Sequence, residues 1–239
     1  MARLALFASG VAVAGAGVHA RGEYRVAPPN GIGSLERAWS GSTAGAAGTI
    51  DPKVLGLALR AAECAVVSNA VSRLSTLTVI DYSKPSTEDR LWVFDVPGRA
   101  LLYQELVAHG QGSGDDRATA FSNEPESHRS SLGLFETGDS YVGSNGYSLR
   151  LRGLERGFND RAFERAIVMH GAPYVSEAFI RTTGRLGRSW GCPALAQGIA
   201  REVIDTIKGS GLLFAYYPDQ RWLEQSGFLS CGVTAGSRQ

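Results

Sequence analysis

Short apolar runs separated by turn residues fill the chain from residue 77 onward, and they constrain the fold more than any other feature. β-Branched and aromatic residues are frequent in these runs, which is typical of β-strands. Thirty glycines favour a fold with many turns over a helical bundle. The runs expected as strands are 77–82, 91–95, 101–107, 133–138, 147–151, 166–169 and 212–217, with a hairpin turn at Pro97-Gly98.

Two helices are expected to pack against these strands. Asp51-Pro52 provides an N-cap followed by proline at the first helical position, and apolar residues at helical spacing continue to Leu74. A second amphipathic pattern covers residues 199–208 and ends at Gly209. We therefore expect a mainly β (α+β) domain over residues 51–222, a sandwich or partly closed barrel with an N-terminal helix over 51–74 and a late packed helix.

The N-terminal segment is predicted to be a signal peptide over residues 1–20. Met1-Ala2-Arg3 is short and positive, an apolar stretch of small residues follows, and Val18-His19-Ala20 is typical of a cleavage site. The alternative is a retained membrane anchor, although the stretch is short for a span. Both alternatives place the rest of the chain outside the cytoplasm, in the periplasm or cell envelope, and no other segment is apolar and long enough to span a membrane.

The remaining segments are predicted from composition. Residues 21–50 are rich in Gly, Ser and Pro and are expected to form a flexible linker, and residues 223–239 a C-terminal tail. Residues 110–131 and 172–191 are expected to form long loops, which in a compact domain are usually functional. A net charge of +1 gives no reason to expect nucleic-acid binding.

Three cysteines occur, at positions 64, 192 and 231. In an oxidising compartment a pair between Cys64 and Cys231 would leave Cys192 free, but the sequence alone does not establish this pairing. The chain has no Cys-x-x-Cys motif and no histidine cluster, so neither a metal site nor a cofactor is expected.

The segment Arg188-Ser189-Trp190-Gly191-Cys192-Pro193 contains the strongest candidate for a nucleophile. A cysteine between Gly and Pro lies on a turn that presents its sulfur, and the nearby Arg181, Arg185 and Arg188 favour the thiolate. The backbone N–H groups here can form an oxyanion hole. The alternative is a buried structural cysteine.

His170 is the candidate base, because it ends a predicted strand and is followed by Gly171. A Cys–His pair is sufficient for acyl transfer, since the imidazole takes the thiol proton and later protonates the leaving amine. The alternative is a structural histidine. His109 also follows an apolar strand and is expected to be structural or channel-lining, with a second catalytic histidine as the alternative, and His128 is expected to be solvent-exposed.

These segments resemble the murein L,D-transpeptidase catalytic-domain family (YkuD-like), in the branch with Ser-Trp-Gly-Cys-Pro in place of Ser-His-Gly-Cys. The resemblance covers roughly residues 50–222 and includes several separated motifs in order. Besides 166–171 and 187–194, these are segments 81–86, 109–110, 121–123, 130–133 and 146–150.

The resemblance implies a role for each matching residue. It implies that Cys192 is the acylated nucleophile, that His170 is the base, and that the fold is of the L,D-transpeptidase type. The backbone of Trp190 and Gly191 matches the oxyanion hole. The residues implied to contact substrate are Ser189, Arg188, Tyr147, Tyr174, Gly171 and Ser131.

Two departures from the family pattern concern the substrate contacts. Trp190 stands where the common motif has His, and Ala194 where it has Arg or Asn, so a polar contact must come from elsewhere, with Arg188 as the candidate. The reaction implied is attack by Cys192 on the amide between an L-diamino acid and D-alanine of a peptidoglycan stem, followed by transfer to an amine in a 3→3 cross-link. The alternatives are an L,D-carboxypeptidase on the same stem and a non-catalytic peptidoglycan-binding protein, and a monomer is expected.

Overall fold

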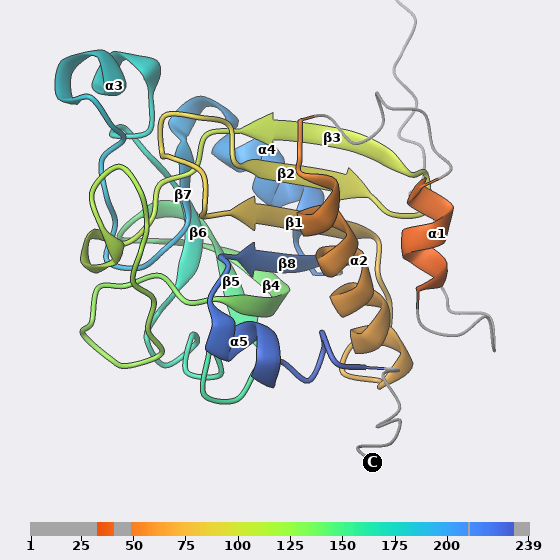
Figure 1. Cartoon of the computed structure of the whole chain (residues 1–239). Coiled ribbons are helices and arrows are strands. Elements are labelled where there is room, and N and C mark those ends of the chain that lie inside the picture. Colours follow the sequence, from red (N-terminus) through yellow and green to blue (C-terminus); the bar gives the residue numbers. More distant parts are fainter. Residues whose placement is uncertain (1–32, 41–48, 210, 232–239) are drawn as a thin grey trace, which may run out of the picture.

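The computed structural model describes residues 33–40, 49–209 and 211–231 (Figure 1). The predicted signal peptide at 1–20 lies outside these ranges. Across the described ranges, no helix has the length and apolar character needed to cross a membrane.

A single mixed sheet forms the body of the molecule. Its strands are ordered β3-β2-β1-β8-β4-β5-β6-β7 (Figure 1). Their bounds are β1 Thr76–Asp81, β2 Leu91–Asp95, β3 Ala100–Glu105, β4 Gly133–Gly143, β5 Gly146–Gly153, β6 Val168–Ala172, β7 Ala194–Ala196 and β8 Gly211–Tyr216. The seven predicted strands are all present within a few residues of their expected bounds, and β2 and β3 form the predicted hairpin.

The sheet curves until its two edges almost meet. Just after β3, Ala108 forms an antiparallel bridge with Ala194 of β7, and its N–H donates to the Ala194 carbonyl at 2.8 Å. Gly110 and Ser189 form a second bridge next to it. These contacts make the sheet a nearly closed barrel, which confirms the expected partly closed architecture.

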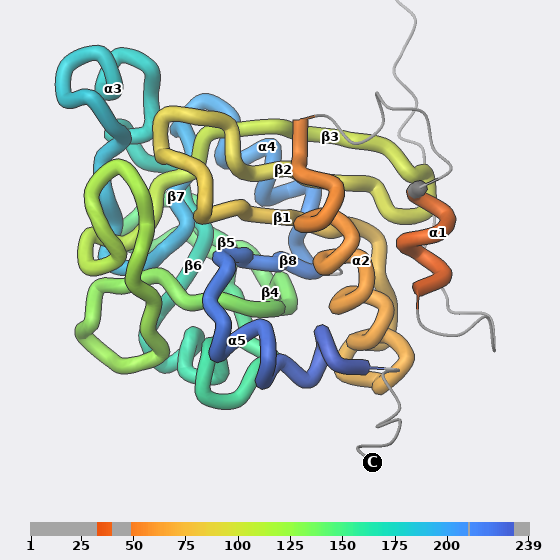
Figure 2. Tube along the Cα trace, viewed as in Figure 1, coloured from red at the N-terminus to blue at the C-terminus, as the bar shows by residue number. Residues whose placement is uncertain are grey.

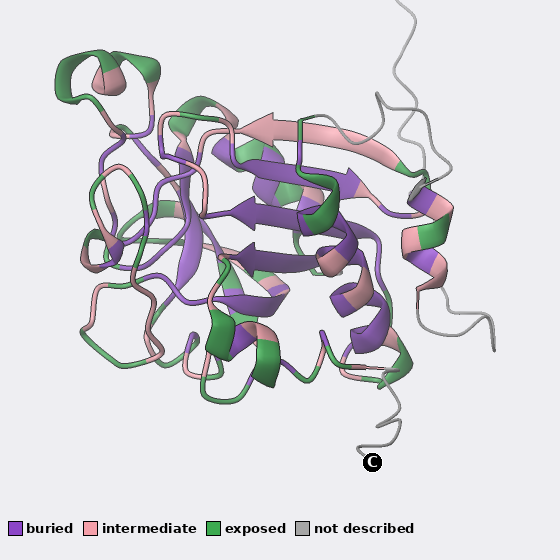
Figure 3. Cartoon of the chain, viewed as in Figure 1, coloured by how far each residue is buried: buried purple, intermediate pink, exposed green. Residues whose placement is uncertain are grey.

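The middle of the sheet is buried on both faces. Every residue of β1 and β8 is buried (Figure 3), and these two strands run parallel to each other. A continuous apolar strand covered on both sides is the pattern that a parallel pair requires. Helix α4 (Gln197–Ile207), the predicted late helix, covers one face with Ala200, Val203, Ile204 and Ile207.

Helix α2 (Pro52–Val67) is the predicted N-terminal helix, but it is shorter than expected. Asp51 caps its first turn as predicted, because the Asp51 carboxylate accepts from the Lys53 N–H at 2.7 Å. The helix ends at Ser68, and Asn69 adopts a left-handed conformation with φ 57°. The expected end at Leu74 is therefore wrong, although Leu74 is buried in the core without being helical.

The described part of the expected linker is not flexible. Helix α1 (Ser34–Ser40) lies within it and contacts α2, and its Leu35 and Trp39 are buried, with the Trp39 ring edge-on to Phe94 of β2. The buried carboxylate of Glu63 accepts from the backbone N–H of Ser34 at 3.1 Å at the start of α1. A carboxylate at a helix N-terminus stabilises it. The linker prediction for residues 21–50 is therefore corrected to include a docked helix.

The loops and tail also contain short helices that the sequence patterns did not predict. Helix α3 (Glu177–Thr183) lies in the second long loop and has no buried residue, and Figure 1 shows it projecting from the body. Helix α5 (Gln220–Gln225) crosses the expected start of the tail. Because Leu229 is also buried, the prediction of a tail from residue 223 is wrong at least as far as Cys231.

A disulfide between Cys64 and Cys231 fixes this C-terminal segment. It joins α2 to the stretch after α5, and Figure 2 shows the blue C-terminal segment beside the orange helix. The pairing that the sequence left open is therefore present. Cys192 remains the free cysteine.

Removing this disulfide is expected to destabilise the protein without altering the nucleophile. Because the bond closes a loop of 167 residues, the double variant Cys64→Ala/Cys231→Ala should lose about 2–5 kcal/mol of unfolding free energy. Urea denaturation of oxidised wild type and the double variant measures the difference. Iodoacetamide should alkylate Cys192 at the same rate in both proteins, and an unchanged urea midpoint would contradict the prediction.

Candidate active site

The nucleophile candidate lies at the edge between β6 and β7. Cys192 comes two residues before β7, which runs parallel to β6. Its Sγ accepts from the backbone N–H of Val168 at 3.4 Å and lies 3.7 Å from the carbonyl of Ala166. The residue is buried, with 8% of its surface exposed.

His170 lies two residues beyond Val168 on β6, and alternation along the strand places both side chains on one face. Its Nδ1 lies 3.1 Å from the carbonyl of Gly171. Because a carbonyl only accepts, Nδ1 carries the proton of the neutral ring and Nε2 has the free lone pair. Throughout the described ranges, no hydrogen bond joins the His170 ring to Cys192 Sγ.

The electrostatic environment favours a neutral thiol beside a neutral imidazole. Burial raises the pKa of the Cys192 thiol, and the Val168 N–H and the Arg165 guanidinium act in the opposite direction. Burial also lowers the pKa of His170. The resting pair is therefore suited to general-base activation of a thiol, and not to a preformed thiolate–imidazolium pair.

Arg165 is a site residue that the sequence analysis missed. Its guanidinium donates to the carbonyls of Ser122 and Arg129, both at 2.6 Å, and also to the hydroxyls of Ser127 and Ser131. These bonds hold the loop of residues 122–131 against the segment that leads into β6. The same cation lowers the pKa of Cys192. No local pattern marks this arginine, because every one of these partners is distant in sequence.

Ser189 closes the turn of residues 189–192, which contains the candidate nucleophile and is called the nucleophile turn below. Its Oγ accepts from the Gly191 N–H at 3.1 Å and donates to the Cys192 carbonyl at 2.6 Å. The Gly191 N–H is therefore engaged within the turn, in contrast to its expected role as an oxyanion donor. The N–H groups of Trp190 and Cys192 make no hydrogen bond within the described part of the chain, so they remain as donors for a ligand.

Glycine is required at position 191. Its φ is 116°, a left-handed conformation that L side chains rarely adopt, and a Cβ there would lie 2.8 Å from the Arg129 carbonyl. Gly110, in the loop after β3, also lies close to this turn, since a Cβ on Gly110 would lie 2.7 Å from the Gly191 Cα. The nucleophile turn is thus packed backbone against backbone on the loop after β3.

An exposed aromatic pair stands beside the nucleophile turn. Trp190 is 71% exposed and stacks on His128, with ring centroids 5.0 Å apart and an angle of 14° between the planes. The Gln111 side-chain amide lies 3.0 Å from His128 Nδ1. His128 is thus half-buried and ordered, and not the freely solvated residue that the sequence predicted.

The other predicted substrate residues divide into two groups. Tyr174 lies near the nucleophile, and burial, with a smaller effect of Cys192, raises its pKa to about 12. Ser131 bonds Arg165 at 2.6 Å beneath the turn. Tyr147 and Gly171 face α4 instead: Arg201 lies 4.0 Å from the Tyr147 ring centroid, and a Cβ on Gly171 would lie 3.0 Å from that of Ala200.

The three arginines predicted near the nucleophile have other partners. Arg188 forms an ion pair with Asp115 at 2.9 Å, and Arg185 lies 4.0 Å from the same carboxylate. Arg181 pairs with Glu177 on α3. Arg188 is therefore linked to the loop after β3 through Asp115, and its role in substrate binding stays a prediction.

A buried guanidinium holds the chain segment that packs against the nucleophile turn. Arg90, with no exposed surface, donates to the Val107 carbonyl at 2.8 and 3.0 Å and to Nδ1 of His109 at 2.8 Å. Burial, with the Arg90 charge beside it, lowers the pKa of His109 to about 4. His109 is consequently neutral and structural, one of the two roles expected for it.

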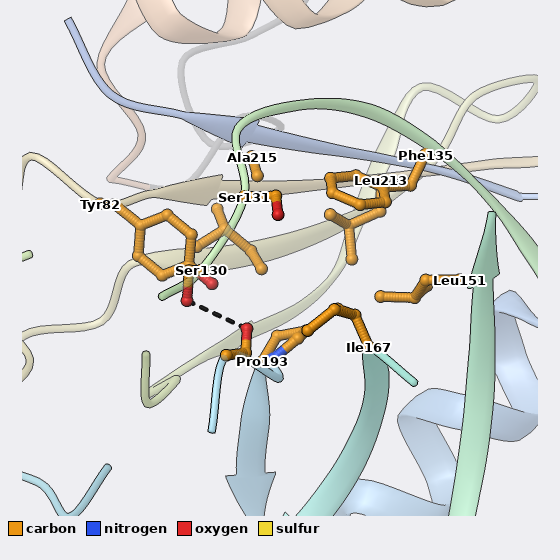
Figure 4. Close-up of a pocket in the computed structure, with 11 residues that line it drawn as sticks. Tyr82, Ser130, Ser131, Phe135, Leu151, Ile167, Pro193, Leu213 and Ala215 are labelled. Carbon is orange, nitrogen blue, oxygen red and sulfur yellow. Dashed lines mark hydrogen bonds between the residues drawn. The ribbon is translucent and has the colours of Figure 1, made fainter. Parts of the chain in front are cut away.

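A small cavity of about 10 Å³ lies between the nucleophile turn and the sheet (Figure 4). Apolar side chains form most of its wall, and Tyr82, Ser130 and Ser131 contribute its hydroxyl groups. Ser130 donates to the Gly191 carbonyl at 3.1 Å, the bond that is dashed in Figure 4. The cavity is too small for a substrate, so ligands must approach from the outer face.

The sequence matches a known family over most of its length. The L,D-transpeptidase catalytic domain matches residues 46–216, a range that includes both Cys192 and His170. The chain belongs to the L,D-transpeptidase catalytic domain family. No curated protein sequence matches it significantly.

Solved structures of similar fold are distant in sequence. An L,D-transpeptidase from Mycobacterium smegmatis is 13% identical, with 60% of this chain and 59% of that chain covered and a TM-score of 0.38. L,D-transpeptidase 1 of Mycobacterium tuberculosis is 12% identical, with 60% and 62% covered and a TM-score of 0.34. Bd1075 of Bdellovibrio bacteriovorus is 14% identical, with 60% and 48% covered and a TM-score of 0.38. The chain thus spans less than two thirds of the length of each.

The alkylation of Cys192 is expected to depend on pH in the alkaline range. Because burial raises the thiol pKa, the iodoacetamide rate should reach half its maximum above about pH 8.5, the value of an unperturbed cysteine. Mass spectrometry of time points across the pH range measures this rate, with Cys192→Ala as the blank. Half-maximal reaction near neutral pH would contradict the assignment of a resting thiol.

Replacing Arg165 is expected to slow this reaction at fixed pH. Arg165→Gln removes the cation that favours the thiolate, so the alkylation rate at pH 8 should fall roughly threefold or more. Arg161→Gln is the matched control, because Arg161 pairs with Glu124 and Glu164 at the surface. Equal rates for both variants would show that Arg165 acts only through the loop that it holds.

Proposed function

We propose that this chain is an exported L,D-transpeptidase that uses Cys192 as nucleophile and His170 as base on peptidoglycan stem peptides. The observation that carries the proposal is that Cys192, just before β7, contacts β6 at Val168, two residues from His170, within the residues matched by the family. The unbonded Cys192 N–H and the nearby Arg165 complete a site suited to acyl transfer.

In the first half-reaction, His170 Nε2 takes the Cys192 thiol proton, and the thiolate attacks the carbonyl of the amide between the diamino acid and D-alanine. The resulting oxyanion accepts from the Cys192 N–H. Collapse of this intermediate breaks the C–N bond, and the His170 imidazolium protonates the departing D-alanine amine. The product is a thioester on Cys192.

The second half-reaction regenerates the enzyme. An acceptor amine enters, His170 removes its proton, and the amine attacks the thioester to form the new amide and release the Cys192 thiolate, which then takes the proton from His170. Before either half-reaction the Cys192 side chain must turn from its contacts with Val168 and Ala166 toward His170. Such adjustments on substrate binding are common, because catalytic hydrogen bonds are often loose in the free enzyme.

Export is part of this proposal. A disulfide between Cys64 and Cys231 is typical of proteins that fold in an oxidising compartment. This agrees with the signal peptide predicted at residues 1–20 and with a substrate in the cell envelope.

The experiment measures D-alanine release from a tetrapeptide donor, with and without a second stem as amine acceptor. We expect release by the wild type, a cross-linked product with the acceptor, and loss of both activities by more than about a hundredfold in Cys192→Ala and His170→Ala. Release with hydrolysed tripeptide as the sole product would favour an L,D-carboxypeptidase. Binding of the donor without release by folded wild type would favour a non-catalytic binding protein.

A further inference from the structure

A second and larger cavity, of about 240 Å³, lies beside the start of helix α5. Its wall is formed by the loop at 121–124, by Leu132, by the turn at 157–158, and by Asp219 and Arg221. It shares no lining residue with the small cavity beneath the nucleophile turn. A single water needs only about 10–15 Å³ of such space, and pockets for drug-sized ligands measure about 300–1,000 Å³. This cavity, called the α5 cavity below, therefore suits a small organic molecule.

The wall of the α5 cavity contains an acid and a base that are not paired with each other. No ion pair joins Asp219 to Arg221, and neither forms one with any other residue in the described ranges. One Asp219 oxygen accepts from the Trp222 N–H at 2.7 Å and caps α5. Arg221 makes no hydrogen bond to any described residue. Glu124, the other charged residue of the wall, is already paired with Arg161 at 2.8 Å. One carboxylate oxygen and one guanidinium thus remain for a ligand.

Both of these charged groups are held in place by contacts within the protein. The guanidinium carbon of Arg221 lies 5.4 Å from the ring centroid of Phe158, which is within the range of a cation–π contact. A guanidinium held over a ring keeps its N–H edge free, and this edge can bind a carboxylate through two parallel bonds. The capping bond to Trp222 fixes the Asp219 side chain. The two charges are therefore positioned before any ligand arrives.

The rest of the wall is ordered and partly apolar. The Phe121 ring packs on Tyr217 with ring centroids 4.9 Å apart, and Leu132 is buried. The side-chain amide of Asn123 is engaged, since it donates to the Asp160 carboxylate at 2.8 Å. The apolar groups can cover a short hydrocarbon side chain, while the two charged groups bind the polar end of the same molecule.

We propose that the α5 cavity binds a small zwitterionic α-amino acid, with its carboxylate on Arg221 and its ammonium group on Asp219. A simple anion would gain the contact with Arg221 but face the Asp219 charge, and a simple cation would meet the reverse. A ligand that carries both groups is favoured by both charges. The site itself does not depend on the proposed function, but the choice of probe does. The reaction proposed above releases D-alanine, a zwitterion with a single methyl group as its side chain.

The test is an NMR titration of ¹⁵N-labelled Cys192→Ala protein, in which no turnover takes place. D-Alanine should cause saturable shifts in the N–H signals of Ser122, Gly157 and Trp222 at the cavity. D-Alaninamide lacks the carboxylate and propionate lacks the ammonium group, so each should bind at least tenfold more weakly than D-alanine. Equal binding of the three compounds, shifts confined to the nucleophile turn, or the absence of saturable shifts overturns the inference.

Variants of the two charged residues locate the site. Arg221→Gln and Asp219→Asn should each raise the Kd for D-alanine about tenfold or more, and Arg221→Lys should restore part of the first loss. Asparagine is also a good N-cap, so Asp219→Asn should preserve α5. Arg152→Gln is the matched control, because this arginine pairs with Glu136 and does not line the cavity. An unchanged Kd in either cavity variant overturns the inference.

This binding experiment is independent of the proposed function. If the wild type releases D-alanine from no stem peptide, the proposed function fails, whereas saturable binding that requires both charged residues still supports the α5 cavity as an amino-acid site. Conversely, an active enzyme whose cavity signals do not respond to D-alanine overturns only the present inference.

Discussion

The buried guanidinium of Arg90 is the interaction on which the site most depends. A charge without exposed surface is costly unless each N–H finds an acceptor, and here the backbone of Val107 and Lys84 and the ring of His109 supply them. These bonds fix the path of the chain after β3. The His109 carbonyl then accepts from the Ser189 N–H, so the nucleophile turn is built on a segment that Arg90 holds.

The other contacts that hold the site together are also mostly polar. Ser189, Ser130 and Ser131 bond backbone or side-chain groups in adjacent loops, and Arg165 joins the outer loop to the entry of β6. Loops that lack a large apolar face gain their order from such bonds. Cys192 thus lies in a turn that these hydrogen bonds hold in place. The stacked rings of Trp190 and His128 lie beside this turn.

The strands could be predicted because their signal is local. Apolar and β-branched composition within five or six residues predicted the bounds of β1, β2 and β8 to within one residue. Helices α1, α3 and α5 were missed because six or seven residues give too few turns for a periodic pattern. The predicted end of α2 was wrong because Val71 and Leu74 are apolar and buried but not helical. Their apolar character extended the helical pattern beyond the real end of the helix.

In the candidate site, too, the residues in local motifs were predicted and those that depend on tertiary structure were not. Cys192 and His170 were predicted from short motifs, whereas Arg165 contacts residues of a loop that is far away in sequence. Arg188 was a reasonable candidate by sequence distance alone, but Asp115 is its partner. Short motifs along the chain supplied the candidate reacting groups, and the tertiary structure determined which charges surround them.

The disulfide joins the first and last of the three cysteines and passes over the middle one. As the chain emerges from its N-terminus, Cys64 appears first, Cys192 second and Cys231 last. Cys192 is therefore available to Cys64 before the correct partner is, and a bond between these two cysteines would leave Cys231 unpaired and the C-terminal segment without its covalent link to α2. In the folded chain the Cys192 sulfur accepts from the Val168 N–H, which holds it apart from the two paired cysteines.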